Sequence, residues 1–288
     1  MEPVLLGIIG GSGVYDMDGL TDVSEERIST PFGDPSDAIV VGSLSGVRVA
    51  FLPRHGRGHR ITPSELNSRA NIFALKSLGV QFIVSISACG SMRQDYAPRH
   101  IVVPDQIFDR TKSRASSFFG QGLVVHISFD EPYCPTLNQL VFEAVARTGA
   151  TVHKGGTFLV IEGPQFSTKA ESRIYRQWGV DIIGMTALPE AKLAREAEIC
   201  YAAMAHVTDY DVWHETEDPV TLAMLIENLT ANAAVTKQAL RYLAPMVAQL
   251  SERSCKCATA LSTAIITQRE AIPAHTKREL ALLLHKYL

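Results

Sequence analysis

The chain is poor in cysteine, and this scarcity argues against a small disulfide-stabilised secreted domain and against a zinc-binding domain. Its 288 residues include five cysteines, which are too few for the disulfide framework of a small secreted domain. No CxxC pair and no histidine cluster has the spacing of a zinc site. The cysteines are Cys89, Cys134, Cys200, Cys255 and Cys257. We therefore expect a cytoplasmic protein that holds no metal.

The chain also lacks an excess of charge and a long apolar run. Its 27 basic and 30 acidic residues give a net charge of -3, so nothing indicates binding to nucleic acid or to an anionic membrane. The longest weakly charged stretch, "SLGVQFIVSISACGSM", is too short and polar to span a bilayer. The N-terminal "MEPVLLGIIGGSG" has Glu2 where a signal peptide has basic residues. We expect a protein that acts on small molecules.

Short apolar strands alternate with amphipathic segments along the chain. Strands are expected at 4–10, 38–42, 48–54, 81–87, 100–108, 156–163, 180–185 and 201–207. Helical periodicity appears at 65–79 and 136–150, and 218–250 fits one long helix or two. This alternation predicts an α/β fold, a largely parallel or mixed sheet flanked by helices. The uniform composition predicts a single domain over 1–288.

Two segments depart from the alternation. The irregular stretch 109–135 is a candidate binding loop, because long loops in compact domains are usually functional or disordered. The tail, about 250–288, ends in an amphipathic helix that we expect to pack on the surface of the assembled protein. The apolar residues of that helix are Leu280, Leu282, Leu283, Leu284 and Leu288.

Six predicted strands end in polar or glycine-rich clusters. The clusters lie at 7–13, 51–56, 85–91, 160–167, 182–186 and 205–211. In α/β sheets, ligands bind outside the carboxyl ends of the strands, so we expect these clusters to meet at one rim. The pocket would collect Ser12, Arg54, His55, Ser87, Phe166, Met185, Thr186, Asp209 and Asp211.

One part of this pocket suits a phosphate dianion. Arg54 offers a bidentate guanidinium and His55 an imidazole donor, while Ser12, Ser87 and Thr186 offer hydroxyls. The glycines of 7–13 fit a phosphate-binding turn and a tight strand-to-helix turn equally well. They do not form a dinucleotide fingerprint, because GxGxxG needs glycine where Asp16 stands.

The other part suits a purine. Phe166 and Met185 would sandwich a base, although each residue type is more often found in a core. Asp209 and Asp211 are two positions apart at the end of a strand, so both carboxylates should point the same way. A base with an exocyclic amine and a ring nitrogen that must be protonated would need such a pair. One carboxylate would be ionised and the pKa of the other raised by its neighbour.

A series of motifs occurs in a specific order along the chain: "GIIGGSG", "TPFGDPSDA", "RHGRGH", "ANIFALKSLG", "ACGS", "EPYCP", "IEGPQFST", "DIIGMT" and "TDYDVW". From about residue 5 to about 245 the chain resembles the 5′-methylthioadenosine phosphorylases of the trimeric purine nucleoside phosphorylase family. The resemblance implies a nucleoside phosphorylase fold with a mixed central sheet and a homotrimer. It also implies phosphorolysis of 5′-methylthioadenosine, with adenosine left open, using inorganic phosphate and no cofactor.

The resemblance also assigns roles to single residues. It gives the phosphate contacts to Ser12, Arg54, His55, Ser87, Thr186 and the backbone N–H of Ala88. It places Phe166 and Ile183 at the purine, Met185 at the ribose, and Asp209 and Asp211 at N7 and the 6-amino group. It places His126, Leu222 and Leu225 around the 5′-alkylthio group, with His126 reaching a neighbouring subunit. The implied mechanism is dissociative, and Asp209 is the expected acid.

The chain departs from the family pattern at a few positions. Ser12 and Ser87 stand where many relatives have threonine, which keeps the hydroxyl, and Gly184 stands where some have asparagine. Cys255 and Cys257 resemble a CxC disulfide of some heat-adapted relatives. Two other functions remain open: a phosphorylase for 6-oxopurine nucleosides, which would need asparagine in place of Asp211, and a non-catalytic purine-binding protein that has kept the fold.

Overall fold

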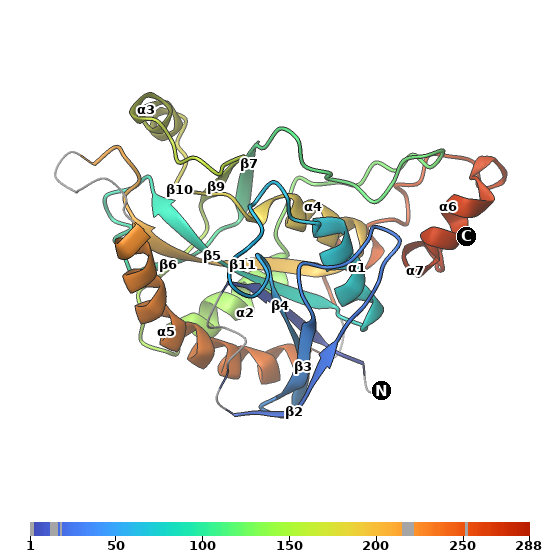
Figure 1. The fold of residues 1–288 in the computed structure, drawn as a ribbon, viewed down its shortest axis with the longest axis horizontal. Coiled ribbons are helices and arrows are strands. Elements are labelled where there is room, and N and C mark those ends of the chain that lie inside the picture. Colours follow the sequence, from blue (N-terminus) through green and yellow to red (C-terminus); the bar gives the residue numbers. More distant parts are fainter. Residues whose placement is uncertain (1–2, 12–16, 18, 215–221, 251–252) are drawn as a thin grey trace.

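The computed structural model describes residues 3–11, 17, 19–214, 222–250 and 253–288, without the side chains of 222–231. Within these residues, eleven strands form one mixed sheet (Figure 1). The strands are β1 (Leu6–Gly10), β2 (Leu20–Glu26), β3 (Ile39–Leu44), β4 (Val47–Pro53), β5 (Phe82–Ser91), β6 (Ile101–Val103), β7 (Gln106–Arg110), β8 (Val152–Lys154), β9 (Thr157–Ile161), β10 (Ile182–Gly184) and β11 (Cys200–Asp209). The helices are α1 (Ser68–Ser77), α2 (Pro135–Ala146), α3 (Lys169–Gln177), α4 (Ala187–Glu196), α5 (Leu222–Ala248), α6 (Ala274–Glu279) and α7 (Ala281–Leu284). The predicted α/β class is confirmed.

The sheet branches at β5. Its main path runs β2-β3-β4-β1-β5-β10-β9-β7, and β11 pairs with the other edge of β5 and continues to β6 and β8. The strands β1, β4, β5 and β11 are mutually parallel, whereas β10 runs antiparallel to β5 and parallel to β9. All residues of β11 and nearly all of β5 are buried, as expected for central strands covered on both faces.

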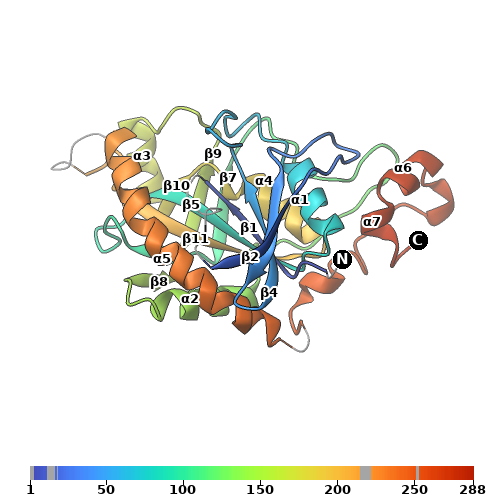
Figure 2. The same ribbon diagram turned by 60° about the horizontal axis from the view of Figure 1, so that its bottom comes forward.

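Helices cover both faces of the sheet (Figure 2). On one face α1 contacts α4, and on the other α2 contacts α5. Each face has its own apolar core, with Ile72 and Leu193 in the first and Val141 and Leu243 in the second. Removing these side chains from water is the main favourable term in folding. The branched sheet is therefore held between two helical layers.

Several local predictions need correction. The expected strand 100–108 is two strands, β6 and β7, separated at Pro104 and Asp105. The sequence analysis missed β2, whose mostly exposed residues lack an apolar face, and the very short β8. The long helical segment is one helix, α5, with Pro245 inside it.

The C-terminal tail folds as two short helices, α6 and α7, instead of one amphipathic helix. Leu280, Leu283 and Leu284 are buried in the core cluster that α1 and α4 share, while Leu288 stays 38% exposed. Two backbone bonds join the tail to the long loop, from His126 N–H to the Ala264 carbonyl and from Ile266 N–H to the Val124 carbonyl. The tail and the candidate binding loop therefore form one continuous layer.

Candidate active site

A gap interrupts the pairing along one edge of β5. On this edge β1 pairs with Phe82–Ser85 and β10 pairs with Gly90 and Ser91, and no strand of the described residues pairs with 86–89. On the other edge β11 pairs with 86–89. Because β10 runs opposite to β1, the carboxyl ends of the two strands face each other across these four residues, the β5 gap. The predicted clusters that follow β1 and β10 therefore meet through opposed strands of a mixed sheet. A break of this kind in a sheet is a usual place for a ligand.

Arg54 follows β4 beside the β5 gap and forms a buried ion pair. Its Nε donates to Glu190 Oε1 at 2.6 Å, and both side chains are 2% exposed. Its other nitrogens donate to the Ile86 carbonyl at 2.8 Å and to Ser85 Oγ at 2.6 Å. Burial alone would lower the pKa of Arg54, but the Glu190 carboxylate raises it above the ordinary value. The guanidinium that the sequence analysis assigned to phosphate thus has Glu190 as its bidentate partner.

Glu190 was missed by the sequence analysis, although it links three strands to α4. Besides Arg54, its Oε2 accepts hydrogen bonds from Ser85 Oγ and from the Tyr201 hydroxyl, both at 3.0 Å. It lies in the "LPEAKLA" segment, where a single acidic residue among apolar ones was the available signal. The network fixes Arg54 in a single orientation.

His55 is held as a neutral acceptor. Its Nδ1 lies 2.8 Å from the Ile61 carbonyl, which only accepts, so Nδ1 carries the proton. Burial lowers the pKa of His55 to about 4, and the Arg54 charge acts in the same direction. At neutral pH, Nε2 is therefore unprotonated, and the expected imidazole donor is an acceptor in this structure.

Two hydroxyls at the β5 gap have no partner within the described residues. Ser87 Oγ and Thr186 Oγ1 are buried and make no hydrogen bond. Thr186 is the N-cap of α4, yet its side chain does not cap the helix. A buried hydroxyl without a partner costs free energy, so both suit a polar ligand. Ala88, which follows Ser87 in β5, is half-buried, and Ser12 lies outside the described residues.

Asp209 and Asp211 lie at the far end of the β5 gap, but not on one strand face. β11 ends at Asp209, and Asp211 follows in a left-handed turn with φ 51°. The Asp211 N–H donates to Asp209 Oδ1 at 2.8 Å, and Thr208 Oγ1 donates to Asp209 Oδ2 at 2.6 Å. Asp211 Oδ2 is buried and has no hydrogen-bond partner in the described part of the chain. The turn brings the carboxyls together in place of the predicted period of two.

The pKa values of both carboxyls are raised. Burial is the main cause for each, and the Asp209 charge is a smaller contribution to the rise at Asp211. The expected division into one ionised carboxylate and one group raised by its neighbour is therefore replaced by two groups raised by burial. Both are 8% exposed, so each holds a proton more readily than a surface aspartate would.

Gly90 makes room for this cluster. A Cβ on Gly90 would lie 2.9 Å from Asp209 Oδ1, 3.1 Å from Ile183 Cγ2 and 3.4 Å from Asp211 Cβ. Ile183, 5% exposed, therefore lies close to the aspartates, and its expected place at the purine stays a prediction. Gly184 has a similar role, because a Cβ there would lie 2.9 Å from the Phe158 ring. An asparagine at position 184 would require the Phe158 ring to move.

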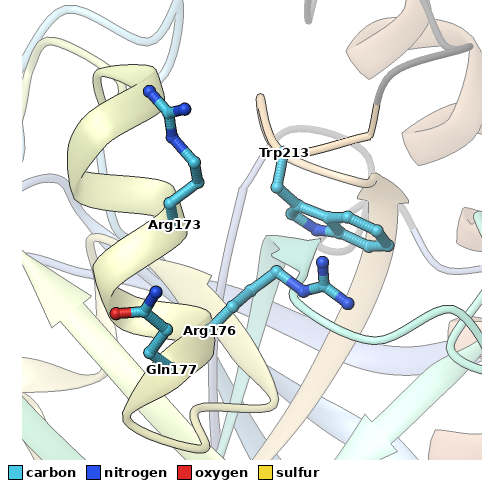
Figure 3. A pocket seen from close by; sticks show the side chains of 4 residues that line it. All are labelled: Arg173, Arg176, Gln177 and Trp213. Carbon is cyan, nitrogen blue, oxygen red and sulfur yellow. The ribbon is translucent and has the colours of Figure 1, made fainter.

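Arg176 and Trp213 brace the turn that carries Asp211. Figure 3 shows the Arg176 guanidinium against the Trp213 indole, 3.6 Å from the ring centroid. Trp213 Nε1 donates to the Ser91 carbonyl at 2.7 Å, and Arg176 Nε donates to the Met92 carbonyl at 3.0 Å. A surface cavity beside them, about 430 Å³, is lined by Arg173, Arg176, Gln177 and Trp213 and by no predicted site residue. We therefore infer that this region holds the Asp211 turn in place and is not itself part of the candidate site.

Arg114 brings the long loop to the site and was also missed. Its NH1 donates to the Met185 carbonyl at 2.5 Å and the Leu188 carbonyl at 2.6 Å, and its NH2 to the Glu162 carbonyl at 2.5 Å. The half-buried Met185 is fixed in this way beside Thr186, with its side chain against Gly163. The predicted binding loop therefore positions the end of β10.

The remaining predicted residues are either exposed or have side chains outside the described part of the structure. Phe166 is 55% exposed and His126 is exposed. Leu222 and Leu225 belong to α5, but their side chains are not described. Whether these residues belong to the site therefore stays a prediction.

Comparison with known proteins gives a consistent family. The Phosphorylase superfamily profile matches residues 5–244. S-methyl-5′-thioadenosine phosphorylase of Geobacter sulfurreducens is 53% identical over 100% of both chains, and that of Chloroflexus aurantiacus is 55% identical over 100% of this chain and 99% of the other.

Solved structures agree. A methylthioadenosine phosphorylase from an antarctic soil metagenomic library has a TM-score of 0.94 at 48% identity and covers 99% of this chain and 100% of its own. The Schistosoma mansoni enzyme in complex with adenine has a TM-score of 0.84 at 36% identity, over 90% of this chain and 96% of its own. These similarities extend beyond the profile match and include the tail. The chain belongs to the phosphorylase superfamily and, within it, to the family of S-methyl-5′-thioadenosine phosphorylases.

Proposed function

We propose that the protein cleaves S-methyl-5′-thioadenosine with inorganic phosphate, giving adenine and 5-methylthioribose 1-phosphate. The observation that carries this proposal is the pairing of two sets of polar groups along the β5 gap. Partnerless hydroxyls and a buried guanidinium lie at one end, and two buried carboxyls lie at the other. Ser87 and Gly90, which mark the two ends, are about 10 Å apart along an extended strand. A ribose fits between a phosphate and a purine held at these ends.

The phosphate end would bind and orient the nucleophile. Ser87 and Thr186 donate hydroxyl hydrogens, together with Ser12 and the Ala88 N–H. Neutral His55 accepts from the remaining hydroxyl of hydrogen phosphate, because its Nε2 is unprotonated. Glu190 fixes Arg54 and balances its charge, which leaves the phosphate free to face the sugar. Positioning of this kind converts a bimolecular attack into an effectively unimolecular one.

The purine end would neutralise the leaving group. Cleavage ahead of attack gives a ribosyl cation and a purine anion, which must be protonated at N7. Asp209 is the acid, since burial raises its pKa and two hydrogen bonds fix its carboxyl. The partnerless Asp211 Oδ2 accepts from the 6-amino group. Ile183 and Phe166 border the base, and Met185 contacts the ribose.

We further propose that the enzyme is a cytoplasmic homotrimer without a cofactor in its reaction. The exposed His126 would reach the 5′-alkylthio group bound by a neighbouring subunit, and Leu222 and Leu225 would make that pocket apolar. Support comes from the exposure of His126 and Phe166 in a single chain. The absence of any disulfide among the described cysteines fits a reducing compartment. None of the described helices is long and apolar enough to cross a membrane.

The test measures kcat/KM for methylthioadenosine, adenosine, inosine and methylthioinosine, each with and without phosphate. We expect no turnover without phosphate and a preference for 6-amino substrates. Asp211→Asn should raise the methylthioinosine-to-methylthioadenosine ratio about ten- to hundredfold, because an amide donates to a 6-oxo group. Asp130→Asn, at an exposed carboxylate, is the control. Preference of the wild type for inosine would favour the 6-oxopurine phosphorylase, and binding without products would favour a purine-binding protein.

A further inference from the structure

Four of the five cysteines converge at one point away from the candidate active site. The Sγ atoms of Cys134, Cys200, Cys255 and Cys257 all lie within 4.8 Å of one another, and three of the four residues are buried. Cys200 pairs with Phe82 at the start of β5, whereas the β5 gap begins at residue 86. The cluster therefore takes no part in the site described above.

Three separate parts of the chain supply these sulfurs. Cys134 is the N-cap of α2, and Cys200 is the first residue of β11. Cys255 and Cys257 lie at the 3₁₀ turn η1 (Lys256–Thr259), after α5. The Cys134 N–H donates to the Tyr201 carbonyl at 2.8 Å, which fixes the first two against each other. Because no two of these segments are neighbours in sequence, the spacing rules that excluded zinc do not detect the set.

We propose that the four cysteines bind one zinc ion as a structural tetrathiolate site. Tetrahedral zinc with Zn–S bonds of about 2.3 Å places its sulfurs about 3.8 Å apart. The Cys200–Cys255 pair is at 3.4 Å, and no separation exceeds 4.8 Å, so small side-chain movements complete the tetrahedron. The Leu137 N–H points to Cys134 Sγ at 3.5 Å, a contact that suits a thiolate acceptor. Binding converts four thiols into thiolates and releases four protons.

The arrangement favours a metal over two disulfides. All four sulfurs approach a common centre, whereas disulfides would divide them into pairs. A bond between Cys255 and Cys257 would close a ring across a single residue, far from relaxed disulfide geometry. All five cysteines are free in the structure. This proposal differs from the expectation of a metal-free chain, which rested on spacing alone.

The zinc would fasten the tail to the body of the protein. Downstream of Cys257, the tail runs along the loop that carries His126. It then buries Leu283 and Leu284 in the core. Upstream, Arg253 NH1 donates to the Glu198 carbonyl at 2.9 Å, two residues before Cys200. The site thus joins the start of α2, the start of β11 and the beginning of the tail. Its loss should loosen the tail first.

The test uses the full chain, purified with a thiol reductant from cells grown with zinc. Elemental analysis and native mass spectrometry should show one zinc per chain. The Cys255→Ser/Cys257→Ser double variant should retain none. Cys89→Ala, at a buried cysteine outside the cluster, should keep its zinc and serves as the control. Removing zinc from the wild type with a chelator should lower its melting temperature and leave the double variant unchanged.

Two results would overturn the proposal. One is a wild-type zinc content no higher than that of the double variant. The other is an intact mass, measured on protein purified without reductant, that is lighter by the hydrogens lost in two disulfides and rises on reduction. If the double variant does not fold, the proposal is tested on the wild type alone, by adding Co²⁺ to chelator-treated protein and recording its absorption spectrum. A sulfur-to-cobalt charge-transfer band supports the tetrathiolate site, and its absence counts against it.

Discussion

The buried pair between Arg54 and Glu190 gives the sharpest prediction. Glu190→Gln keeps the shape of the side chain but removes its charge and one acceptor oxygen. Glu190 Oε1 accepts from Arg54 Nε at 2.6 Å, and Oε2 accepts from Ser85 and Tyr201 at 3.0 Å. Whichever way the amide turns, its NH₂ group faces at least one of these donors. Arg54, at 2% exposure, then keeps a charge without a compensating partner.

Breaking a buried ion pair by removing one partner typically costs about 3–5 kcal/mol. We expect a loss of that size in the free energy of unfolding, measured from urea midpoints at constant m-value. The matched control is Glu25→Gln, because Glu25 pairs with Arg57 at the same 2.6 Å but with side chains 48% and 39% exposed. An exposed pair is worth about 0–1 kcal/mol. If both variants lose the same stability, burial does not set the value of the Arg54 pair.

Three other variants test the site. Asp209→Asn should lower kcat about a hundredfold or more for every purine, because an amide cannot deliver a proton to N7; unchanged kcat would exclude Asp209 as the acid. In the wild type, the neutral His55 should disfavour sulfate, which has no proton to donate at neutral pH, and His55→Gln should weaken the preference for phosphate by about tenfold. An equal phosphate-to-sulfate ratio in both proteins would mean that His55 does not read the phosphate hydroxyl. Arg176→Ala should raise KM for methylthioadenosine more than KM for phosphate, since Arg176 packs on Trp213 beside Asp211; equal effects would contradict that bracing.

The sheet was predictable where burial gives the sequence a local signal. The central strands β1, β4, β5 and β11 are mostly apolar, and each was located from its composition. β2, "LTDVSEE", is exposed along most of its length, so pairing with β3 decides its conformation. The direction of β10 also depends on pairing, because three residues carry no information about which way they will lie against β5.

The site was predictable as a set of residue types but not as a set of contacts. Polar residues at strand ends marked Arg54, Ser87 and Asp209, because apolar strands rarely end in such groups without a reason. Their partners were not predictable in the same way: Glu190 lies 136 residues from Arg54, and no periodicity connects them. The cysteine cluster shows the same limit, since its four sulfurs come from three segments joined only by the fold.

The contacts of Arg54 and His55, which the sequence did not reveal, determine the net charge at the proposed phosphate end. Glu190 balances the charge of Arg54, and His55 is neutral because its pKa is lowered to about 4. The nearby Arg57 and Arg60 are paired with Glu25 and Asp37. In the reaction that we propose, a phosphate bound here would therefore keep much of its own negative charge. In a dissociative reaction the sugar becomes positive in the transition state, so that retained charge stabilises the transition state more than the ground state. A pocket with a free arginine and a protonated histidine would hold phosphate more tightly and would weaken this stabilisation.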